Sequence, residues 1–157
     1  MRPAVITLHT AQPADAGTLG AMITDAAAAH AWKPRPHSAA QDIAHAGMMI
    51  DHGWVTLAES DGAICGFLAV EESYIHGLFV APHAQRHGFG SALLRDAQRG
   101  RDRLELWTFQ RNTDAQRFYL RHGFVEIART AGDNDEGLPD IRYQWRRADA
   151  AARGYRP

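Results

Sequence analysis

Two glycines stand where an expected strand leads into an expected helix, in the segment Gln85–Ser91, which reads Gln-Arg-His-Gly-Phe-Gly-Ser. The start of a helix leaves several backbone N–H groups without an internal partner and carries the positive end of the helix dipole. Because Gly88 and Gly90 have no Cβ, the backbone there can approach an anion closely, and Arg86 adds a fixed positive charge. The segment therefore predicts a phosphate-binding loop.

Two well-known kinds of phosphate loop do not match this segment. A dinucleotide-binding fingerprint needs a third glycine at the position where Leu93 stands. A P-loop needs a lysine followed by Ser or Thr, and the only lysine of the chain is Lys33. The remaining alternative to a phosphate loop is an ordinary tight turn that happens to contain two glycines.

A second patterned segment, Asn112–Phe124, follows about twenty residues later and reads Asn-Thr-Asp-Ala-Gln-Arg-Phe-Tyr-Leu-Arg-His-Gly-Phe. Its first part, Thr113–Gln116, matches a capping box, and Gly123 is a typical helix end. Asn112 and Tyr119 are seven residues apart. Seven residues make about two helical turns, so both side chains are expected on one helix face.

These two segments carry a resemblance to a known family. Gln85–Gly90 resembles the Gln/Arg-x-x-Gly-x-Gly/Ala signature of the GNAT superfamily of acyl-CoA N-acyltransferases, and Asn112–Phe124 is similar to its second signature. The resemblance is specific for about Tyr74–Phe124. It implies an N-acetyltransferase that transfers the acetyl group of acetyl-CoA to a primary amine, by direct attack in a ternary complex and without a metal.

The resemblance also implies where the cofactor lies. Acyl-CoA would occupy a cleft where the strands Tyr74–Val80 and Leu104–Phe109 splay apart, with its pyrophosphate on the amides of Arg86–Ser91. Tyr119 would protonate the leaving thiolate, and the Leu78 amide would hold the oxyanion. The expected cofactor-binding residues are Leu78, Phe79, Val80, Gln85, Arg86, His87, Gly88, Phe89, Gly90, Ser91, Asn112, Ala115, Phe118 and Tyr119.

The general base is open. Members of the family often place a glutamate near the position of Tyr74, which is not a carboxylate in this chain. Glu72, His76 and Glu105 are the neighbours that could replace it, and His76 has the ordinary pKa closest to neutral pH. Solvent could also take the proton with no preformed base. The expected catalytic residues are Tyr119, His76 and Glu72.

The remaining pattern predicts an α+β fold in three layers. Its mixed, mostly antiparallel central sheet would be splayed between the fourth and fifth strands and flanked by about four helices, in one domain over residues 1–157. The expected strands are Val5–Leu8, Trp54–Glu59, Ile64–Val70, Tyr74–Val80, Leu104–Phe109, Phe124–Arg129 and Ile141–Trp145. The expected helices are Asp15–Ala29, the stretch from Ser38 to near Gly53, Phe89–Arg99 and Ala115–His122, and Asp61-Gly62 predicts a tight hairpin.

Composition agrees with a globular, cytoplasmic protein. The chain has 157 residues, of which 45% are hydrophobic and 22% charged, and no apolar run is long enough to span a membrane. A single cysteine, Cys65, excludes a disulfide framework or a thiolate zinc cluster within one chain. Four of the nine histidines, His30, His37, His45 and His52, precede the expected hairpin, and none of these forms the helical His-x-x-x-His pattern with a nearby acid that zinc proteases use.

Charge is unevenly distributed although the net charge is only −1. Residues 1–78 hold three Lys or Arg against eight acids, whereas residues 79–157 hold fourteen Arg against ten acids. The arginines are either solvated helix faces or part of a cationic half that holds an anionic cofactor. The acidic loop Gly132–Gly137 is likewise either a solvated turn or a lip for a cationic amine.

Other functions stay open at this point. A non-catalytic acyl-CoA-binding module would use the same loop, whereas binding of nucleic acid by the basic half is opposed by the near-neutral total charge. The expected partners are acetyl-CoA and an amine acceptor, with no nucleic acid or membrane, and a homodimer would be ordinary for such a fold. The acceptor is a small-molecule amine, an amino acid, an antibiotic or a protein lysine.

Overall fold

The computed structural model describes residues 5–34 and 37–157. Arg2 and Arg35, which enter the charge count above, lie outside the described residues. The chain groups into two compact units, which are described separately. The first unit holds the chain up to Glu71 together with His76–Leu94, and the second holds Glu72–Ile75 and Arg95–Pro157.

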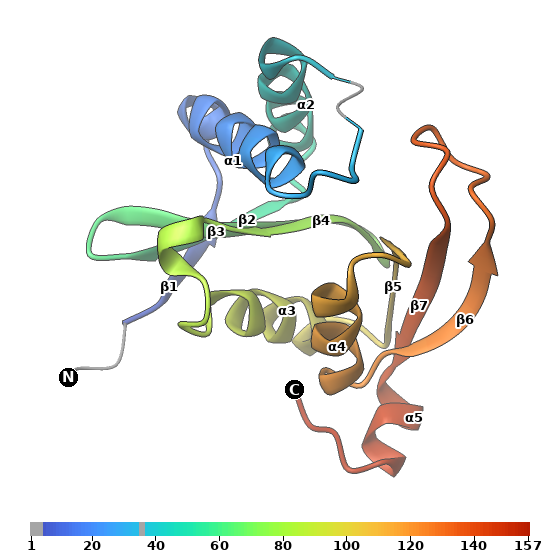
Figure 1. Ribbon diagram of the computed structural model, residues 1–157. Coiled ribbons are helices and arrows are strands. Elements are labelled where there is room, and N and C mark those ends of the chain that lie inside the picture. The colour runs from blue at the N-terminus through green and yellow to red at the C-terminus, as the bar shows by residue number, and fades with distance from the viewer. Residues whose placement is uncertain (1–4, 35–36) are drawn as a thin grey trace. The chain divides into compact units, whose positions relative to one another are not determined.

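Four strands form the frame of the first unit (Figure 1). They are β1 (Thr7–Thr10), β2 (Val55–Ser60), β3 (Ala63–Glu71) and most of β4 (Tyr74–Val80). β2 pairs antiparallel with both β1 and β3. The predicted hairpin is confirmed: Asp61 and Gly62 have φ angles of 53° and 75°, the left-handed pair that a two-residue turn of the twisted type requires.

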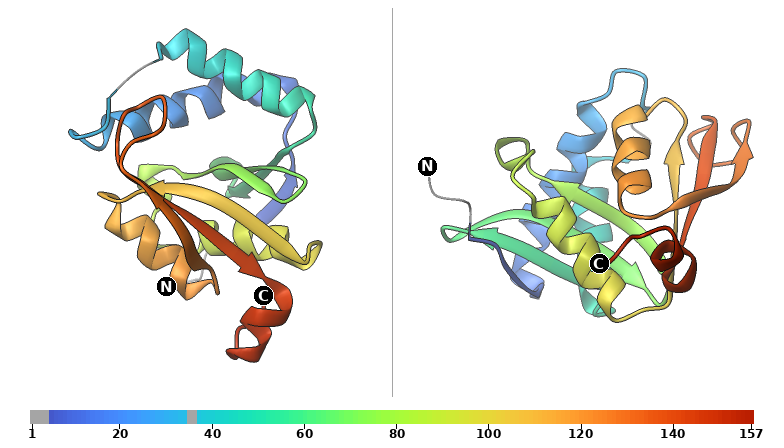
Figure 2. Two further views of the ribbon diagram at one scale, coloured as in Figure 1. Left: turned by 90° about the vertical axis from the view of Figure 1, so that its right-hand side faces the viewer. Right: turned by 90° about the horizontal axis from the view of Figure 1, so that it is seen from below.

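Helices α1 (Ala16–Ala28) and α2 (Ala39–Asp51) lie side by side on one face of these strands (Figure 2). The Thr24 hydroxyl donates to the Asp42 carboxylate across the pair at 2.7 Å. The opposite face carries the start of α3 (Phe89–Arg99), whose Leu93 approaches β3 closely. The observed bounds of β4 and α3 agree with the predicted ones.

The two α-helices of this unit begin differently. Ser38 caps α2, because its hydroxyl accepts from the Gln41 amide at 3.1 Å and the Gln41 side chain accepts from the Ser38 amide. Asp15 precedes α1 but makes no capping bond to it. Its carboxylate instead accepts from the backbone N–H of Gln12 at 2.7 Å, which closes the 3₁₀ turn Pro13–Asp15.

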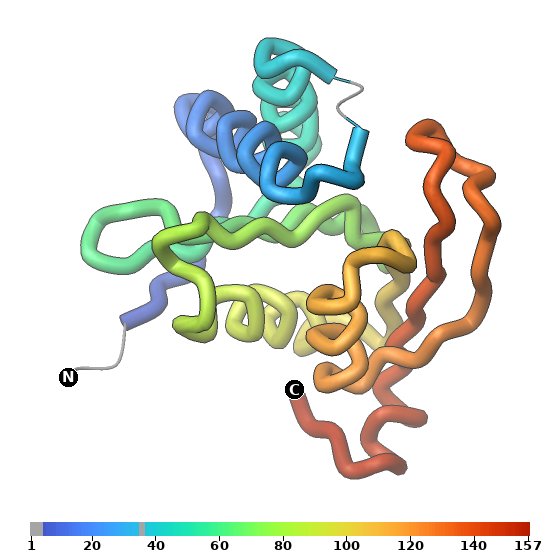
Figure 3. Tube along the Cα trace, viewed as in Figure 1, coloured from blue at the N-terminus to red at the C-terminus, as the bar shows by residue number. Residues whose placement is uncertain are grey.

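The second unit is built on an antiparallel ladder of three strands, in the order β5 (Arg103–Phe109), β7 (Asp140–Arg146) and β6 (Val125–Thr130) (Figure 3). The sequence pattern did not predict the short helix that begins immediately after β7. It is only six residues long and its preceding residue, Arg146, provides no side-chain cap, so it carries too short a pattern to recognise. The elements are β5 (Arg103–Phe109), α4 (Thr113–Arg121), β6 (Val125–Thr130), β7 (Asp140–Arg146) and α5 (Arg147–Ala152).

The hydrogen-bonded strand order is β1-β2-β3-β4-β5-β7-β6, in a seven-stranded mixed sheet. The one parallel pairing recorded is Tyr74 opposite Glu105, both in the second unit, where the Glu105 amide donates to the Ser73 carbonyl at 2.8 Å. This confirms the predicted α+β class with a mixed, mostly antiparallel sheet, and the described residues form five α-helices instead of about four.

Each unit has its own apolar core. In the first unit the fully buried side chains include Leu57, Phe67 and Leu93, and in the second Leu104 and Trp145. None of the helices within the described residues is long and apolar enough to cross a membrane.

Candidate acyl-CoA site

The predicted phosphate loop lies in the first unit, between β4 and α3. Arg86 and Gly88 have φ angles of 66° and 86°, so two residues adopt left-handed backbone conformations before α3 begins at Phe89. Residues 85–88 are exposed, whereas Phe89 is buried and anchors the helix start. The loop is therefore held from its helical side and faces solvent with its backbone.

The start of α3 is suited to an anion. Gly88 has no side chain to cap the helix, and the first turn contains no acidic residue. A Cβ added at Gly88 would meet only Ile6 Cδ1, at 3.9 Å, so the requirement for glycine comes from its φ angle and not from lack of space. Gly88 thus provides no side-chain cap that would compete with a ligand for the first amides of the helix.

The predicted pantetheine strand belongs to the same unit as this loop. Leu78, Phe79 and Val80 are half-buried on β4. The Phe79 ring stacks on Phe67 at 4.9 Å, and the Ala81 amide donates to the Cys65 carbonyl at 2.8 Å, which fixes the end of the strand. The first unit thus brings together Leu78, Phe79, Val80, Gln85, Arg86, His87, Gly88, Phe89, Gly90 and Ser91, as well as His76.

The second predicted segment forms α4 in the second unit. Asn112 is the N-cap, and its side-chain oxygen accepts from the Ala115 amide at 3.2 Å. The predicted capping box with Thr113 at its head is wrong, since asparagine is the stronger cap and takes the place one residue earlier. The Gln116 side chain donates instead to the carbonyls of Phe109 and Gln110.

Tyr119 lies deep in an aromatic cluster. Its side chain is 8% exposed and its ring lies 5.2 Å from Phe118, 5.4 Å from Phe124 and 6.5 Å from Tyr143. Burial raises the pKa of the Tyr119 phenol well above its usual range, so the group stays protonated at neutral pH. Its hydroxyl makes no hydrogen bond to any residue that the structure describes, which leaves the O–H available as a donor.

His76 has a carboxylate partner that sequence reasoning missed. Its Nε2 lies 2.9 Å from Glu71 Oε1, and its ring stacks flat on Trp54 at 4.8 Å. The signal for this pair is the tight connection from β3 to β4, since Glu71 and His76 stand on either side of it. A carboxylate on one ring nitrogen fixes the orientation of the imidazole.

The other two base candidates have different surroundings. Glu72, in the second unit, occupies the turn before β4 with a φ of 53°, and its carbonyl accepts from Arg101 at 2.6 Å. Burial alone would raise the pKa of the Glu105 carboxyl, but hydrogen bonds from Arg142 and Gln144 outweigh it and lower that pKa. A carboxylate so stabilised is a weak base.

The predicted residues therefore fall into two groups, one in each unit. The second unit holds Glu72, Asn112, Ala115, Phe118 and Tyr119. Within the described parts of the chain, no three His, Cys, Asp or Glu side chains are grouped so that they could hold a metal ion.

Comparison with known proteins finds similarity to acetyltransferases. Residues 51–126 match the family model described as "Acetyltransferase (GNAT) domain". The chain is 35% identical over 88 residues to the peptidyl-lysine N-acetyltransferase YiaC of Escherichia coli, an aligned stretch that covers 55% of this chain. The chain spans 60% of the length of that relative.

Solved structures share the fold over most of the chain. An acetyltransferase of the GNAT family from Bacillus cereus superposes with a TM-score of 0.74 and 19% identity, covering 90% of this chain and 97% of that one. The structure of yncA from Salmonella typhimurium with its cofactor acetyl-CoA gives a TM-score of 0.72 and 20% identity, covering 92% and 95%. Residues 51–126 therefore match a GNAT acetyltransferase domain and the chain shares the fold of solved GNAT structures, in agreement with the resemblance found in the sequence.

Proposed function

We propose that this protein is an acyltransferase of the GNAT type, which transfers the acetyl group of acetyl-CoA to a primary amine by direct attack in a ternary complex. The observation that carries the proposal is the start of α3, which has no acid in its first turn and follows Arg86 and Gly88, both with positive φ angles. The match to a GNAT domain over residues 51–126 and the acetyl-CoA in the yncA structure support it.

In this mechanism the loop Arg86–Ser91 binds the pyrophosphate with its amides, and Leu78 and Val80 pair with the pantetheine arm as an added strand would. The amine nitrogen attacks the thioester carbonyl carbon, and the C–S bond breaks when the tetrahedral intermediate collapses. The Leu78 amide donates to the oxyanion. Holding both reactants in one complex provides the proximity that the reaction needs.

Two proton transfers accompany the acyl transfer. The acceptor must lose a proton before it attacks, because a free alkylamine has a pKa of about 10. We assign this step to His76, whose contact with Glu71 orients the ring. Glu72 is the second candidate for this base; its backbone carbonyl accepts a hydrogen bond from Arg101. Tyr119 donates its phenolic proton to the leaving thiolate.

The acceptor class that we propose is a lysine side chain in a protein or peptide. The support is the relative YiaC, which is a peptidyl-lysine N-acetyltransferase. Asp133 and Asp135 agree with it, because both are exposed and neither forms an ion pair with a described residue. Two exposed carboxylates in one loop attract a cationic amine.

Thermal shift with acetyl-CoA, CoA, NADH, ATP and short duplex DNA tests the cofactor, and thiol release with a lysine peptide tests the transfer. A ligand at about 100 times its Kd adds about 2.7 kcal/mol, which raises the Tm by about 5–10 °C at this chain length. We expect a shift with acetyl-CoA and CoA, and thiol release only when the peptide is present. A shift without thiol release for any amine would make the protein a non-catalytic acyl-CoA-binding module.

A further inference from the structure

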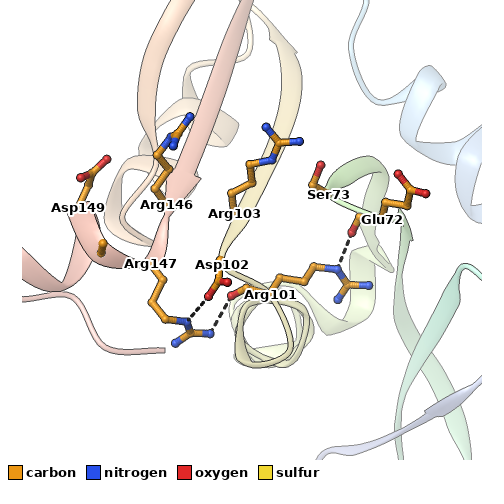
Figure 4. A pocket seen from close by; sticks show the side chains of 9 residues that line it. Glu72, Ser73, Arg101, Asp102, Arg103, Arg146, Arg147 and Asp149 are labelled. Atoms are coloured by element: carbon orange, nitrogen blue, oxygen red, sulfur yellow. Dashed lines mark hydrogen bonds and ion pairs between the residues drawn. The ribbon is translucent and has the colours of Figure 1, made fainter.

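A pocket of about 730 Å³ lies in the second unit, where β5 begins and β7 ends (Figure 4). Its volume is in the range of small-molecule sites. Four arginines and three acids share its wall, and none of the loop or α4 residues of the proposed acyl-CoA site does. The lining residues are Glu72, Ser73, Arg101, Asp102, Arg103, Arg146, Arg147, Ala148 and Asp149.

Two of the arginines oppose each other directly. Arg103 and Arg146 are partners in the β5–β7 register, and their guanidinium groups point to the same side (Figure 4). Like charges directly opposite each other on a sheet are destabilising. Neither forms an ion pair with any described carboxylate, and the charge of Arg103 is offset only through its longer-range attraction to Glu105, whose pKa it helps to lower.

The nearest strand carboxylate is already engaged. Glu105 stands two residues further along β5, on the same face as Arg103, and accepts hydrogen bonds from Arg142 and from Gln144, the latter at 2.7 Å. Gln144 in turn accepts from Arg146 Nε at 3.0 Å. This chain of hydrogen bonds orients the Arg146 side chain without providing a negative charge for it.

The other two arginines are held by neutral groups. Arg101 donates to the carbonyls of Glu72, at 2.6 Å, and Ala97, at 3.1 Å. Arg147 donates to the carbonyls of Gln98 and Arg101. Carbonyls fix a guanidinium but leave its charge uncompensated. The one ion pair at this wall, Arg147 with Asp102, spans 3.7 Å and involves a fully exposed carboxylate, so it is weak.

We propose that this pocket binds a small ligand through a phosphate or pyrophosphate group, seated between Arg103 and Arg146. A guanidinium offers a planar fork of N–H donors that fits phosphate oxygens in pairs, and these bonds are strong because both partners are charged. The phosphate supplies the negative charge that the opposed arginines lack, and the Ser73 hydroxyl adds a donor at the wall. This is a second anion site, distinct from the glycine loop of the first unit.

Calorimetric titration with inorganic pyrophosphate tests the proposal at low ionic strength. The pocket variant is Arg103→Gln/Arg146→Gln, and the matched control is Arg121→Gln/Arg156→Gln, which removes two exposed arginines that do not line the pocket. Gly88→Val, which disturbs the glycine loop, reports separately on pyrophosphate bound there. The Tm of each ligand-free variant shows whether it folds.

We expect the pocket variant to bind pyrophosphate about tenfold or more weakly than wild type, because charge-assisted hydrogen bonds are lost. Its ligand-free Tm should be equal to or above that of wild type, since a repulsion is removed. The control pair and Gly88→Val should keep the pocket's binding. The proposal is wrong if wild type binds no pyrophosphate, if the pocket variant keeps full affinity, or if the control pair weakens binding equally. Loss of acetyl-CoA binding in Gly88→Val would bear on the acetyltransferase proposal alone.

Discussion

The helices α3 and α4 begin in opposite ways. α3 follows Gly88, which has no side chain, and its first turn holds no acid. α4 follows Asn112, whose side chain accepts from the Ala115 amide, and its first turn holds Asp114. Both starts carry the positive end of a helix dipole, but only at the second does the residue before the helix provide a side-chain cap.

This difference shows what a capped and an uncapped helix start do. A cap satisfies one of the free amides and stabilises the helix in the absence of any ligand. An uncapped start keeps its amides free, which costs stability and makes room for an anion. This contrast supports the proposal that the start of α3 binds an anion, whereas Asn112 has a structural task that stands whether or not it also contacts the cofactor.

A substitution of Gly88, the residue with a positive φ angle directly before α3, should have the largest effect on acetyl-CoA binding. In Gly88→Val a branched side chain would stand at a φ of 86°, which forces the loop to rearrange and moves the amides away from the phosphate. Loss of two or more charge-assisted hydrogen bonds raises the Kd for acetyl-CoA by about 100-fold. Calorimetry measures this change.

The control for that substitution is Gly100→Val. Gly100 follows α3 at its other end, and a Cβ there meets no atom within 4 Å. This variant should bind acetyl-CoA as wild type does. If both glycine variants bind acetyl-CoA normally, the start of α3 is an ordinary turn and the comparison with α4 has no functional meaning.

Removing the Tyr119 hydroxyl tests whether α4 contributes a general acid to the reaction. Tyr119→Phe should lower kcat by about 100-fold while the affinity for acetyl-CoA stays close to wild type, as expected for loss of a general acid. Burial raises the pKa of Tyr119, so the phenol stays protonated at every pH below the ordinary pKa of a tyrosine. Loss of the Tyr119 proton should therefore not lower the rate in that pH range. Steady-state kinetics against pH measure both effects.

Tyr143→Phe is the matched control, because it removes a hydroxyl from the same aromatic cluster. It should leave kcat within about twofold of wild type, well short of the effect expected for an acid catalyst. Equal losses in the two variants would show that the cluster needs both hydroxyls for packing, and Tyr119 would then have no special role as an acid.

The sequence predicted best where local pattern and tertiary fold agree. β4 and α3 have the predicted bounds because a strand, a proline, two glycines and a regular apolar stripe all point to one structure. The cap of α4 was misassigned by one residue because both Asn112 and Thr113 are good caps, and only the backbone of Asn112 leaves the helical region.

Contacts between distant residues could not be predicted in this way. The contact of Glu71 with His76 and the hydrogen bonds of Glu105 with Arg142 depend on strand register, which residue types alone do not fix. The opposition of Arg103 and Arg146 has the same origin. The sequence indicated an arginine-rich half of the chain but could not show that two of its arginines face each other.

A substitution of His122, at the C-terminal end of α4, should have a moderate effect on stability that depends on pH. Burial, helped by the charges of Arg95 and Arg121, lowers the pKa of His122 from 6.5 to about 4. The unfolded chain therefore binds a proton here more readily than the folded chain. The stability associated with neutral His122 is present above pH 6.5 and is lost as the pH falls toward 4.

Melting curves between pH 7 and pH 4.5 check this prediction. The Tm of His122→Asn should fall less steeply with pH than that of wild type, whatever its value at pH 7. The exposed His83→Asn should follow the wild-type slope. Parallel curves for wild type and His122→Asn would mean that the proton binds elsewhere.

The smallest effect is expected at the cap itself. Asn112→Ala removes the bond to the Ala115 amide and should lower the stability by about 1 kcal/mol, which corresponds to a fall in Tm of about 2–4 °C. Asn112→Asp keeps a capping oxygen and adds a negative charge at the positive end of the helix, so its Tm should match wild type or exceed it.

These two variants also separate the structural from the binding role of Asn112. If the residue only caps α4, Asn112→Asp keeps both the Tm and the acetyl-CoA affinity of wild type. If its amide also contacts the cofactor, Asn112→Asp keeps the Tm and loses affinity, because a carboxylate cannot donate the hydrogen bond that an amide can. The start of α4 would then be capped and still take part in binding, and the contrast with α3 would lie only in which group of the ligand each helix meets.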